Sequence, residues 1–178
     1  MLDRQHQPHP DRRSLSIECA VVTISDTRTI DTDLSGRLIC QLLQAAGHHI
    51  GRYQIIPDES IQIRAELEAA IDVVPSIQAI VFNGGTGISA RDTTYEAIAS
   101  VLTKTLPGFG EIFRFLSYQE IGSRAIGSRA IAGTYQDLLV FSLPGSQGAV
   151  RLGLEKLILP ELIHLVTQLQ DRDVENPA

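Results

Sequence analysis

Runs of apolar residues along the chain predict a series of buried strands. Residues 17–25 are apolar or β-branched at nearly every position, which is typical of a strand covered on both faces. Residues 50–56 and 79–83 predict two more strands, and residues 138–143 the last clear one. These strands are separated by segments with a different spacing.

In the segments between the predicted strands, apolar residues recur with the spacing of a helix. Apolar positions recur in this way within residues 38–46 and stop at Gly47, a residue suited to the position just past a helix end. A second helical stripe lies within residues 63–74. Thr93 and Glu96 fit a capping box, with a helix beginning at Thr94.

The second half of the chain predicts further helices. Residues 107 and 108, Pro-Gly, predict a break before a short helix around residues 111–117. Apolar positions within residues 150–158 mark a helix after the last strand, and Pro160 either starts a further helix or kinks this one. Alternation of strands and helices predicts an α/β fold, a three-layer α/β/α sandwich with a mainly parallel sheet.

Length and composition favour one folded domain. The chain has 178 residues, of which 43% are apolar, enough to bury a substantial core. We assign residues 16–172 to this domain, because residues 1–15 lack apolar periodicity and are expected to form a flexible N-terminal arm. Residues 173–178 are expected to form a flexible C-terminal tail.

Charge and cysteine content narrow the classes of partner. The net charge is -6 without a basic stripe, which argues against a nucleic-acid or membrane-surface partner. No apolar run approaches the ~20 residues that span a bilayer, and the chain start lacks a secretory hydrophobic segment, so we expect a cytoplasmic location. Cys19 and Cys40 are too scattered for a metal pair and are expected to be buried free thiols.

A glycine-rich loop directly after the strand at residues 79–83 is the strongest chemical signal. Gly84, Gly85 and Gly87 leave backbone N–H groups uncovered and permit positive φ, the conditions for wrapping amides round a phosphate. No Gly-Lys-Ser/Thr follows, so the loop is not a Walker A motif. A plain strand-to-helix turn is the alternative interpretation.

Acidic side chains follow several of the predicted strands. The loops at residues 25–33, 57–60 and 83–92 are expected to converge, because ligands of such sheets bind outside the carboxyl ends of the strands. Asp58 and Asp92 could therefore face one Mg²⁺ held by few carboxylates and several waters. Alternatively, Asp58 after a proline is a turn former.

Two other features have alternative explanations. Ser25 and Asp26, at the end of the first strand, could bind a nucleotide or form an Asx turn. The pentapeptide Gly-Ser-Arg-Ala-Ile occurs twice in succession, at residues 122–126 and 127–131. A period of five is far below the ~20 residues of true repeat architectures, so chance similarity is favoured over a functional repeat. No serine-histidine-acid or cysteine-histidine spacing supports a side-chain nucleophile.

Four ordered motifs resemble the MoaB/MogA family of molybdenum cofactor biosynthesis. The resemblance extends from about residue 18 to residue 169. The motifs are NGGTGISARD at 83–92, LPGFGEIFR at 106–114, SRAIAG at 128–133 and LPGS at 143–146.

The resemblance implies a molybdopterin-binding fold that assembles as a trimer or as a hexamer built from two trimers. It also implies a reaction, in which the terminal phosphate of molybdopterin attacks the α-phosphate of ATP in the presence of Mg²⁺, giving adenylyl-molybdopterin and pyrophosphate. The family's two essential acids fall on Asp58 and Asp92, which would be catalytic and bind the metal. The remaining assignments are substrate binding by Gly84, Gly85, Thr86, Gly87 and Ser89, and nucleotide binding by Ser25, Asp26, Pro144, Gly145 and Ser146.

The motif strings look most like the MoaB branch, in which some members have lost these acids and their activity. This chain keeps Asp58 and Asp92. The expected function is therefore molybdopterin adenylyltransferase, with a non-catalytic molybdopterin carrier or assembly protein as the alternative. Expected partners are other copies of the chain and the protein that inserts molybdenum downstream. The segment at residues 107–114 could serve oligomerisation, and Phe109, Phe113 and Phe115 could be interface, core or pocket residues.

Overall fold

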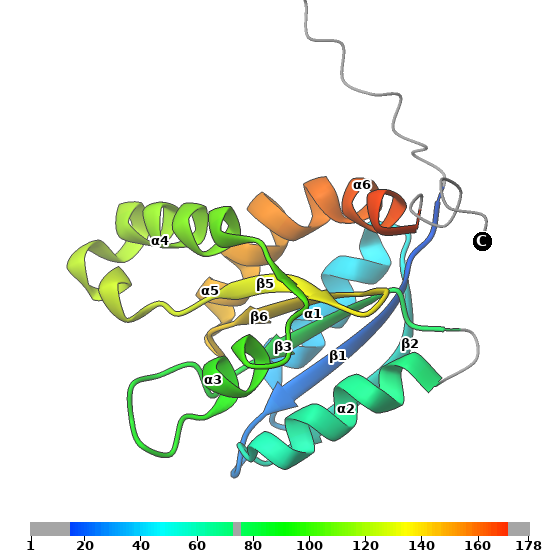
Figure 1. Ribbon diagram of the computed structural model, residues 1–178. Helices are drawn as coiled ribbons and strands as arrows, with labels where there is room; N and C mark the ends of the chain where they lie inside the picture. Colours follow the sequence, from blue (N-terminus) through cyan, green and yellow to red (C-terminus); the bar gives the residue numbers. More distant parts are fainter. Residues whose placement is uncertain (1–14, 73–75, 171–178) are drawn as a thin grey trace, which may run out of the picture.

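The computed structural model describes residues 15–72 and 76–170, which fold into three layers. One six-stranded sheet lies between two layers of helices (Figure 1), so the predicted α/β/α sandwich is confirmed. Most of the predicted N-terminal arm and the whole C-terminal tail lie outside the described residues. In chain order the elements are β1 (Glu18–Ile24), α1 (Leu34–Ala45), β2 (His49–Ile56), α2 (Ser60–Asp72), β3 (Ala79–Asn83), α3 (Thr94–Ala99), β4 (Lys104–Thr105), α4 (Pro107–Ile121), a 3₁₀ helix (Gly122–Gly127), β5 (Ile131–Tyr135), β6 (Leu138–Leu143), α5 (Gln147–Gly153), a π-helical turn (Leu154–Ile158) and α6 (Leu159–Gln170).

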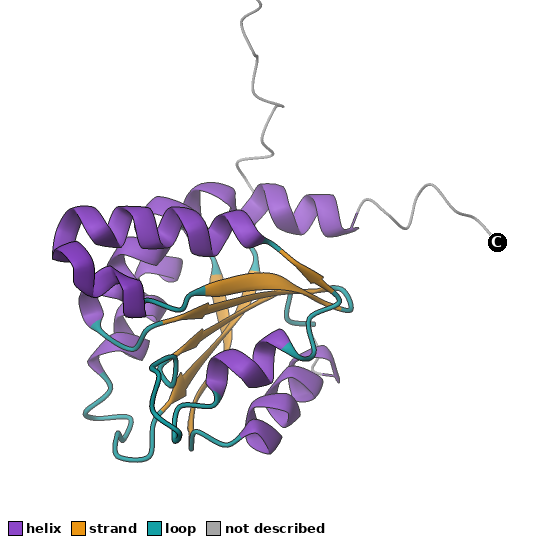
Figure 2. Ribbon diagram, turned by 60° about the vertical axis from the view of Figure 1, so that its left-hand side comes forward, coloured by secondary structure: helices purple, strands orange, loops and turns teal. Residues whose placement is uncertain are grey.

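The sheet has the strand order β2-β1-β3-β6-β5-β4. The first four strands are mutually parallel, while β5 and β4 pair antiparallel at one edge, so the prediction of a mainly parallel sheet is confirmed. Figure 2 shows that the loops following the parallel strands gather at one end of the sheet. Ligands of doubly wound sheets bind at this end.

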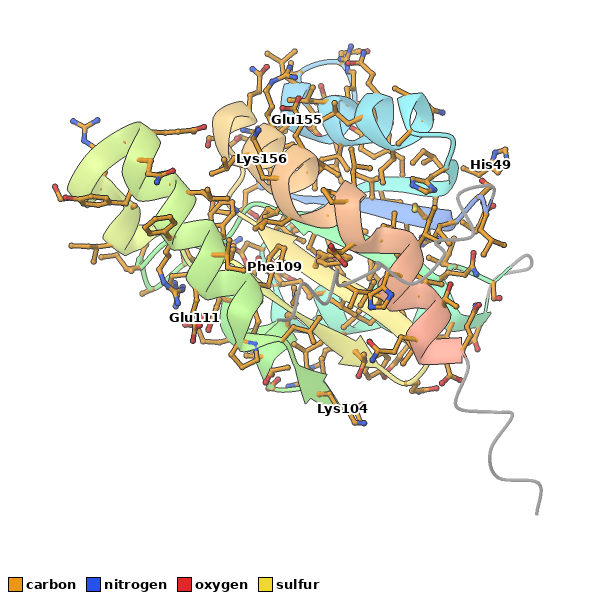
Figure 3. All side chains as sticks on the ribbon, turned by 90° about the horizontal axis from the view of Figure 1, so that it is seen from above. His49, Lys104, Phe109, Glu111, Glu155 and Lys156 are labelled. Atoms are coloured by element: carbon orange, nitrogen blue, oxygen red, sulfur yellow. The ribbon has the colours of Figure 1, made fainter. Side chains whose placement is uncertain are left out.

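Helix α4 is longer than the sequence predicted. It runs for 15 residues and begins at Pro107, so the break predicted there is wrong. Proline is favoured at the first helical position, where its missing N–H has no intrahelical partner to lose. Figure 3 looks onto the layer formed by α1, α4, α5 and α6. In this layer Phe113 is fully buried, Phe109 lies 5.4 Å from Phe141 between ring centroids, and Phe115 is 61% exposed.

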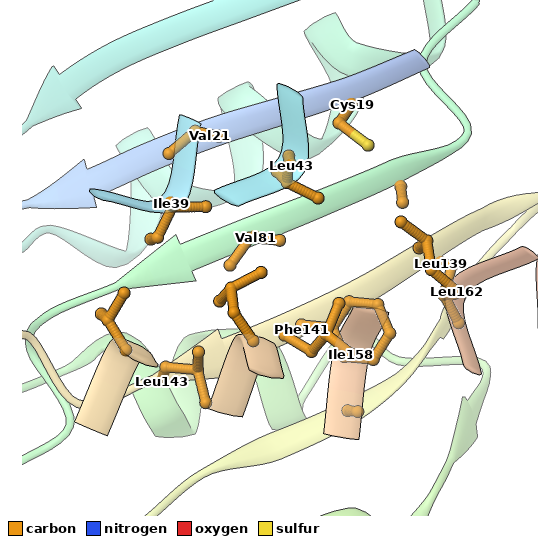
Figure 4. Packing of buried hydrophobic residues seen from close by; sticks show 14 of the residues in the cluster. Cys19, Val21, Ile39, Leu43, Val81, Leu139, Phe141, Leu143, Ile158 and Leu162 are labelled. Atoms are coloured by element: carbon orange, nitrogen blue, oxygen red, sulfur yellow. The ribbon is translucent and has the colours of Figure 1, made fainter. Parts of the chain in front are cut away.

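Apolar side chains pack on both faces of the sheet, which explains the apolar runs in the strands. Alternate residues of β1, β3 and β6 meet the layer of α1, α4, α5 and α6 (Figure 4), and the residues between them meet α2 and α3. Each such side chain stabilises the fold by about 1.5–3 kcal/mol when fully buried. Helices therefore pack against both faces of the sheet that carries these loops.

The last helical segment is continuous from Gln147 to Gln170. A π-helical turn lies directly before α6, in which Pro160 is the second residue. Proline cannot donate its backbone hydrogen bond, and a widened turn is a common local adjustment. None of the helices within residues 15–72 and 76–170 is long and apolar enough to cross a membrane.

Both cysteines are free thiols, and the predicted burial is complete for Cys19 and partial for Cys40. Cys19 is fully buried in β1, and Cys40 is partly buried in α1. Burial raises the pKa of Cys19 to about 12 and that of Cys40 to about 11. Both therefore stay protonated near neutral pH.

Candidate functional site

A pocket of about 520 Å³ opens among the loops at the carboxyl end of the parallel strands. The loops that follow β1, β3 and β6 form its wall. The predicted loops at residues 25–33 and 83–92 therefore meet there, whereas no residue of the loop at residues 57–60 is among the lining residues. Most of the residues singled out in the sequence line it, namely Ser25, Gly84, Gly85, Thr86, Gly87, Asp92, Pro144, Gly145 and Ser146.

Asp26, a predicted nucleotide contact, is not among the pocket-lining residues. Its exposed carboxylate accepts two hydrogen bonds from Arg91, at 2.9 Å from Nε and 2.8 Å from an Nη. The hydrogen bonds from Arg91 hold the pKa of Asp26 below its usual range. This pair ties the loop after β1 to the loop after β3.

Ser25 and Ser146 both line the pocket and both stabilise local turns. The Ser25 hydroxyl accepts hydrogen bonds from the amides of Thr27 at 3.3 Å and Arg28 at 3.2 Å. The Ser146 hydroxyl caps α5 by accepting from the Ala149 amide at 3.2 Å. The turn-forming interpretation of the first loop thus applies to Ser25, whereas the Asp26 carboxylate pairs with Arg91.

The glycine-rich loop has a backbone that side chains would disrupt. Gly84 has φ +108° and Gly85 has φ +59°, values that residues with a Cβ rarely adopt. A Cβ at Gly84 would meet the Ile24 carbonyl oxygen, and one at Gly85 would meet Asp58 Oδ2 and Thr94 Oγ1. The loop backbone therefore packs directly against the end of β1 and the Asp58 carboxylate.

Four successive amides of this loop are free to bind an anion. The Gly84 amide donates to the Leu143 carbonyl at 3.0 Å, and the Ser89 amide donates to Asp92 Oδ2 at 3.0 Å. Between them, the amides of residues 85–88 donate to no acceptor within the described part of the chain. Consecutive unpaired N–H groups beside a pocket form an anion-binding concavity.

Asp58 is buried next to the glycine loop, with only 6% of the residue exposed. Its Oδ1 accepts from the Thr93 amide at 3.1 Å, the Thr93 hydroxyl at 2.8 Å and the Thr94 hydroxyl at 3.1 Å. Asp58 is not among the pocket-lining residues, and Oδ2 is the oxygen that lies against Gly85.

The predicted capping box is wrong in its hydrogen bonds. Thr93 occupies the N-cap position of α3, but its hydroxyl donates to Asp58 and makes no cap bond to the helix. Glu96 pairs with Arg129 instead of reaching back to the cap. Two stronger charged partners from distant segments replace the local bonds that the motif predicts.

Asp92 and Asp58 lie beside different glycines of the same loop. Asp92 Oδ2 lies 2.6 Å from where a Cβ on Gly87 would be, while Asp58 lies against Gly85. Within the described residues no group of three or more histidine, cysteine and acidic side chains could hold a metal. Two carboxylates alone suit Mg²⁺ that shares its coordination with phosphate oxygens and water.

Arg28 is a pocket residue that the sequence analysis missed. Its guanidinium donates to the Gly145 carbonyl at 3.1 Å and to Asp33 Oδ1 at 3.4 Å, and also contacts the Ser35 hydroxyl. It therefore connects the loop after β1 with the loop after β6. Its position three residues after Ser25 was the available signal, but an arginine in a polar loop is unremarkable without the fold.

The buried carboxylate of Asp33 anchors the same loop. It accepts from the Thr23 hydroxyl at 2.5 Å, the Tyr53 hydroxyl at 2.7 Å and the Gly36 amide at 2.9 Å, the last as the N-cap of α1. Burial raises the pKa of Asp33, but these hydrogen bonds outweigh burial and leave the pKa below its usual range. Asp33 therefore remains charged and rigidly held.

Comparison with known proteins agrees with this geometry. Residues 20–164 match the family model described as "Probable molybdopterin binding domain". The chain belongs to the MoaB/MogA family. It is 52% identical over 168 residues to molybdenum cofactor biosynthesis protein B of Halalkalibacterium halodurans, covering 93% of this chain and 98% of that protein. The protein of the same name from Bacillus subtilis is 51% identical over 166 residues, covering 92% and 96% of the two chains.

Solved structures of MoaB/MogA proteins have the same fold. A crystal structure of a molybdenum cofactor biosynthesis protein B superposes with a TM-score of 0.85 at 48% identity, covering 88% of this chain and 98% of that one. The tungsten cofactor synthesizing protein MoaB from Pyrococcus furiosus superposes with a TM-score of 0.77 at 37% identity, covering 87% and 98%. The predicted MoaB/MogA resemblance and its molybdopterin-binding fold are therefore confirmed.

Proposed function

We propose that this chain acts in molybdenum cofactor biosynthesis as a molybdopterin adenylyltransferase. An oxygen of the terminal phosphate of molybdopterin would attack the α-phosphorus of ATP, and the bond from that phosphorus to the β-phosphate oxygen would break. The products are adenylyl-molybdopterin and pyrophosphate. The names of the relatives support the pathway, and the pocket chemistry supports the reaction class.

One observation carries the proposal: free amides and two carboxylates meet along one loop. The amides of residues 85–88 offer a cradle for a phosphate, with Asp58 against Gly85 and Asp92 against Gly87. A site that only bound phosphate would be weakened by two nearby negative charges. The acids are understandable if a cation accompanies the phosphates.

Different residues of the chain would position the two substrates. Mg²⁺ bound with ATP would neutralise charge on the triphosphate and polarise the α-phosphorus. The free amides of the glycine loop would hold the attacking phosphate, while Arg28 and the loop at residues 144–146 border the nucleotide. Such an arrangement accelerates transfer mainly by orientation and by stabilising charge in the transition state.

The test is pyrophosphate release from purified protein with molybdopterin and Mg²⁺-ATP, with adenylyl-molybdopterin identified as the second product. Asp92→Asn, which keeps the shape of the side chain, should lower kcat by at least about a hundredfold. Exposed Asp137 lies in the turn between β5 and β6 and gives a matched control, since Asp137→Asn should leave kcat unchanged. Wild-type protein that binds molybdopterin tightly without turnover would refute the enzyme and leave the carrier.

We further propose that copies of the chain assemble through α4. Large apolar side chains are exposed along this helix, with Phe115 and Tyr118 each 61% exposed and Ile112 50% exposed. Such a patch is unusual on a monomer and typical of an interface. Light scattering should give a trimer or hexamer for the wild type and a smaller species for Phe115→Asp. Copurification would test the proposed contact with the downstream molybdenum-insertion protein.

A further inference from the structure

Arg129 donates hydrogen bonds to the glycine loop but is not among the pocket-lining residues. Its Nε donates to the Thr86 carbonyl at 2.8 Å, and one Nη donates to the Gly87 carbonyl. The other Nη pairs with Glu96, and the guanidinium carbon lies 5.0 Å from the centroid of the Tyr95 ring. The Arg129 side chain is only 24% exposed, so this cation is held on several sides at once.

The two carbonyls that Arg129 binds determine where two loop amides point. In a trans peptide the C=O and the following N–H point in opposite directions. Drawing the Thr86 and Gly87 carbonyls toward Arg129 therefore turns the amides of Gly87 and Ile88 away from it. Both belong to the run of amides that have no acceptor within the described chain. Thr86 and Gly87 line the pocket, whereas Arg129 is not among its lining residues.

This part of the loop has few other restraints. Residues 87–91 are exposed, and the pairs Ser89–Asp92 and Arg91–Asp26 hold only the far end of the loop. At the near end, the Thr94 amide donates to the Gly85 carbonyl at 3.2 Å. Within the described residues, the hydrogen bonds to the carbonyls of Thr86 and Gly87 come from Arg129.

We propose that Arg129 is a positioning residue that holds the amides of the glycine loop toward the phosphate without touching the phosphate itself. The identity of that phosphate as molybdopterin's rests on the proposed function. The planar guanidinium fork suits this task, because it serves two carbonyls and a carboxylate in fixed directions. A lysine has one nitrogen and cannot reproduce this set.

The tandem pentapeptide supplies a matched control for this proposal. Arg124 and Arg129 are the central residues of two identical Gly-Ser-Arg-Ala-Ile copies. The first copy begins the 3₁₀ helix with Arg124 exposed, whereas the second runs out into β5. The copies differ in structure, which agrees with chance similarity. Arg124→Ala and Arg129→Ala thus make the same change in the same local sequence. Only Arg129→Ala removes hydrogen bonds to the glycine loop.

The experiment measures the Kd of molybdopterin by calorimetry and the KM and kcat of the reaction for Arg129→Ala, Arg129→Lys and Arg124→Ala. Loss of loop orientation should raise the Kd and KM for molybdopterin about tenfold to a hundredfold in both Arg129 variants. Arg124→Ala should stay within about twofold of the wild type. Added guanidinium ion should restore part of the activity of Arg129→Ala and none of Arg129→Lys, a response that a folding defect would not give.

Glu96→Gln keeps Arg129 and weakens its ion pair with residue 96. This variant therefore tests the proposal if Arg129→Ala does not fold. It should raise the same Kd by a smaller factor. Equal molybdopterin Kd values in Arg129→Ala and Arg124→Ala, with both folded, would overturn the proposal. If the wild type has no turnover, the adenylyltransferase proposal fails, while the Kd comparison still decides the role of Arg129.

Discussion

Asp58 has a structural role and a proposed catalytic role, which a pair of substitutions can separate. Its Oδ1 accepts three hydrogen bonds from the start of α3, and Oδ2 faces Gly85 in the loop proposed to hold phosphate. Asp58→Ala removes both roles. Asp58→Asn keeps an oxygen acceptor for the three donors and removes the negative charge.

The structure sets the expected cost of each change. Thr94 is fully buried, so in Asp58→Ala its hydroxyl loses a partner that water cannot replace. This loss should lower the free energy of unfolding by about 1–3 kcal/mol. The two Thr93 donors are half-buried and add their smaller net contributions, which gives a total of about 2–4 kcal/mol. Asp58→Asn loses only the charge assistance of these bonds, about 1 kcal/mol, or roughly 2–4 °C in Tm for a chain of this size.

Thermal unfolding and pyrophosphate release measured on both variants distinguish the two roles. We expect Asp58→Asn to melt close to the wild type yet lose at least about a hundredfold in kcat, because a neutral amide binds Mg²⁺-ATP much more weakly than a carboxylate. Thr94→Val is the control, since it breaks one bond to Asp58 and leaves the carboxylate charged. It should lower Tm and keep kcat. Wild-type kcat in Asp58→Asn would refute the reasoning and make Asp58 a purely structural residue.

Four further predictions concern the glycine loop, the buried acid Asp33 and the thiol of Cys19. Gly85→Ala forces a Cβ against Asp58 at positive φ, and should cost about 2–5 kcal/mol in urea unfolding and weaken molybdopterin binding. Tyr53→Phe removes a hydrogen bond to charged Asp33 and should cost about 1.5–3 kcal/mol at neutral pH. Because the folded pKa of Asp33 is depressed, the stability it contributes is present above its unfolded pKa and falls as the pH drops through the folded pKa, so acid titration should show a shallower loss in Asp33→Asn. Cys19, with its pKa raised to about 12, should resist iodoacetamide at pH 8 until the protein is unfolded, and rapid labelling of the native protein would contradict its burial.

The fold was predictable where burial shapes the sequence strongly. Strands β3 and β6 are buried at every position, and their uninterrupted apolar runs follow from that burial. Strands β4 and β5 were not predicted, since β4 consists of two exposed residues and β5 is only partly buried. An antiparallel edge of this kind is defined by its pairing with β6, which no local pattern reports.

Part of the candidate site was also predictable from the sequence, and part was not. The glycine loop was predictable because its requirement for positive φ at Gly84 and Gly85 is local and only glycine meets it readily. The hydrogen-bond partners of Thr93 and Glu96 were not predictable, because the capping motif competes with Asp58 and Arg129 from distant segments. Charged partners brought by the fold replace neutral local ones.

Arg124 and Arg129 show how far local sequence can go in identifying a functional residue. The two residues on either side of each arginine are identical, so a window of five residues does not distinguish them, whereas the longer SRAIAG motif contains only Arg129. What differs is that residue 129 lies two positions before the start of the antiparallel strand β5, which brings its side chain to the loop that follows β3. The antiparallel edge that the sequence did not reveal is thus also what brings Arg129 to the glycine loop. If Arg129 orients the loop amides as proposed, this edge contributes to the site as well as to the sheet, and shortening β5 should weaken phosphate binding even though β5 contains no proposed ligand.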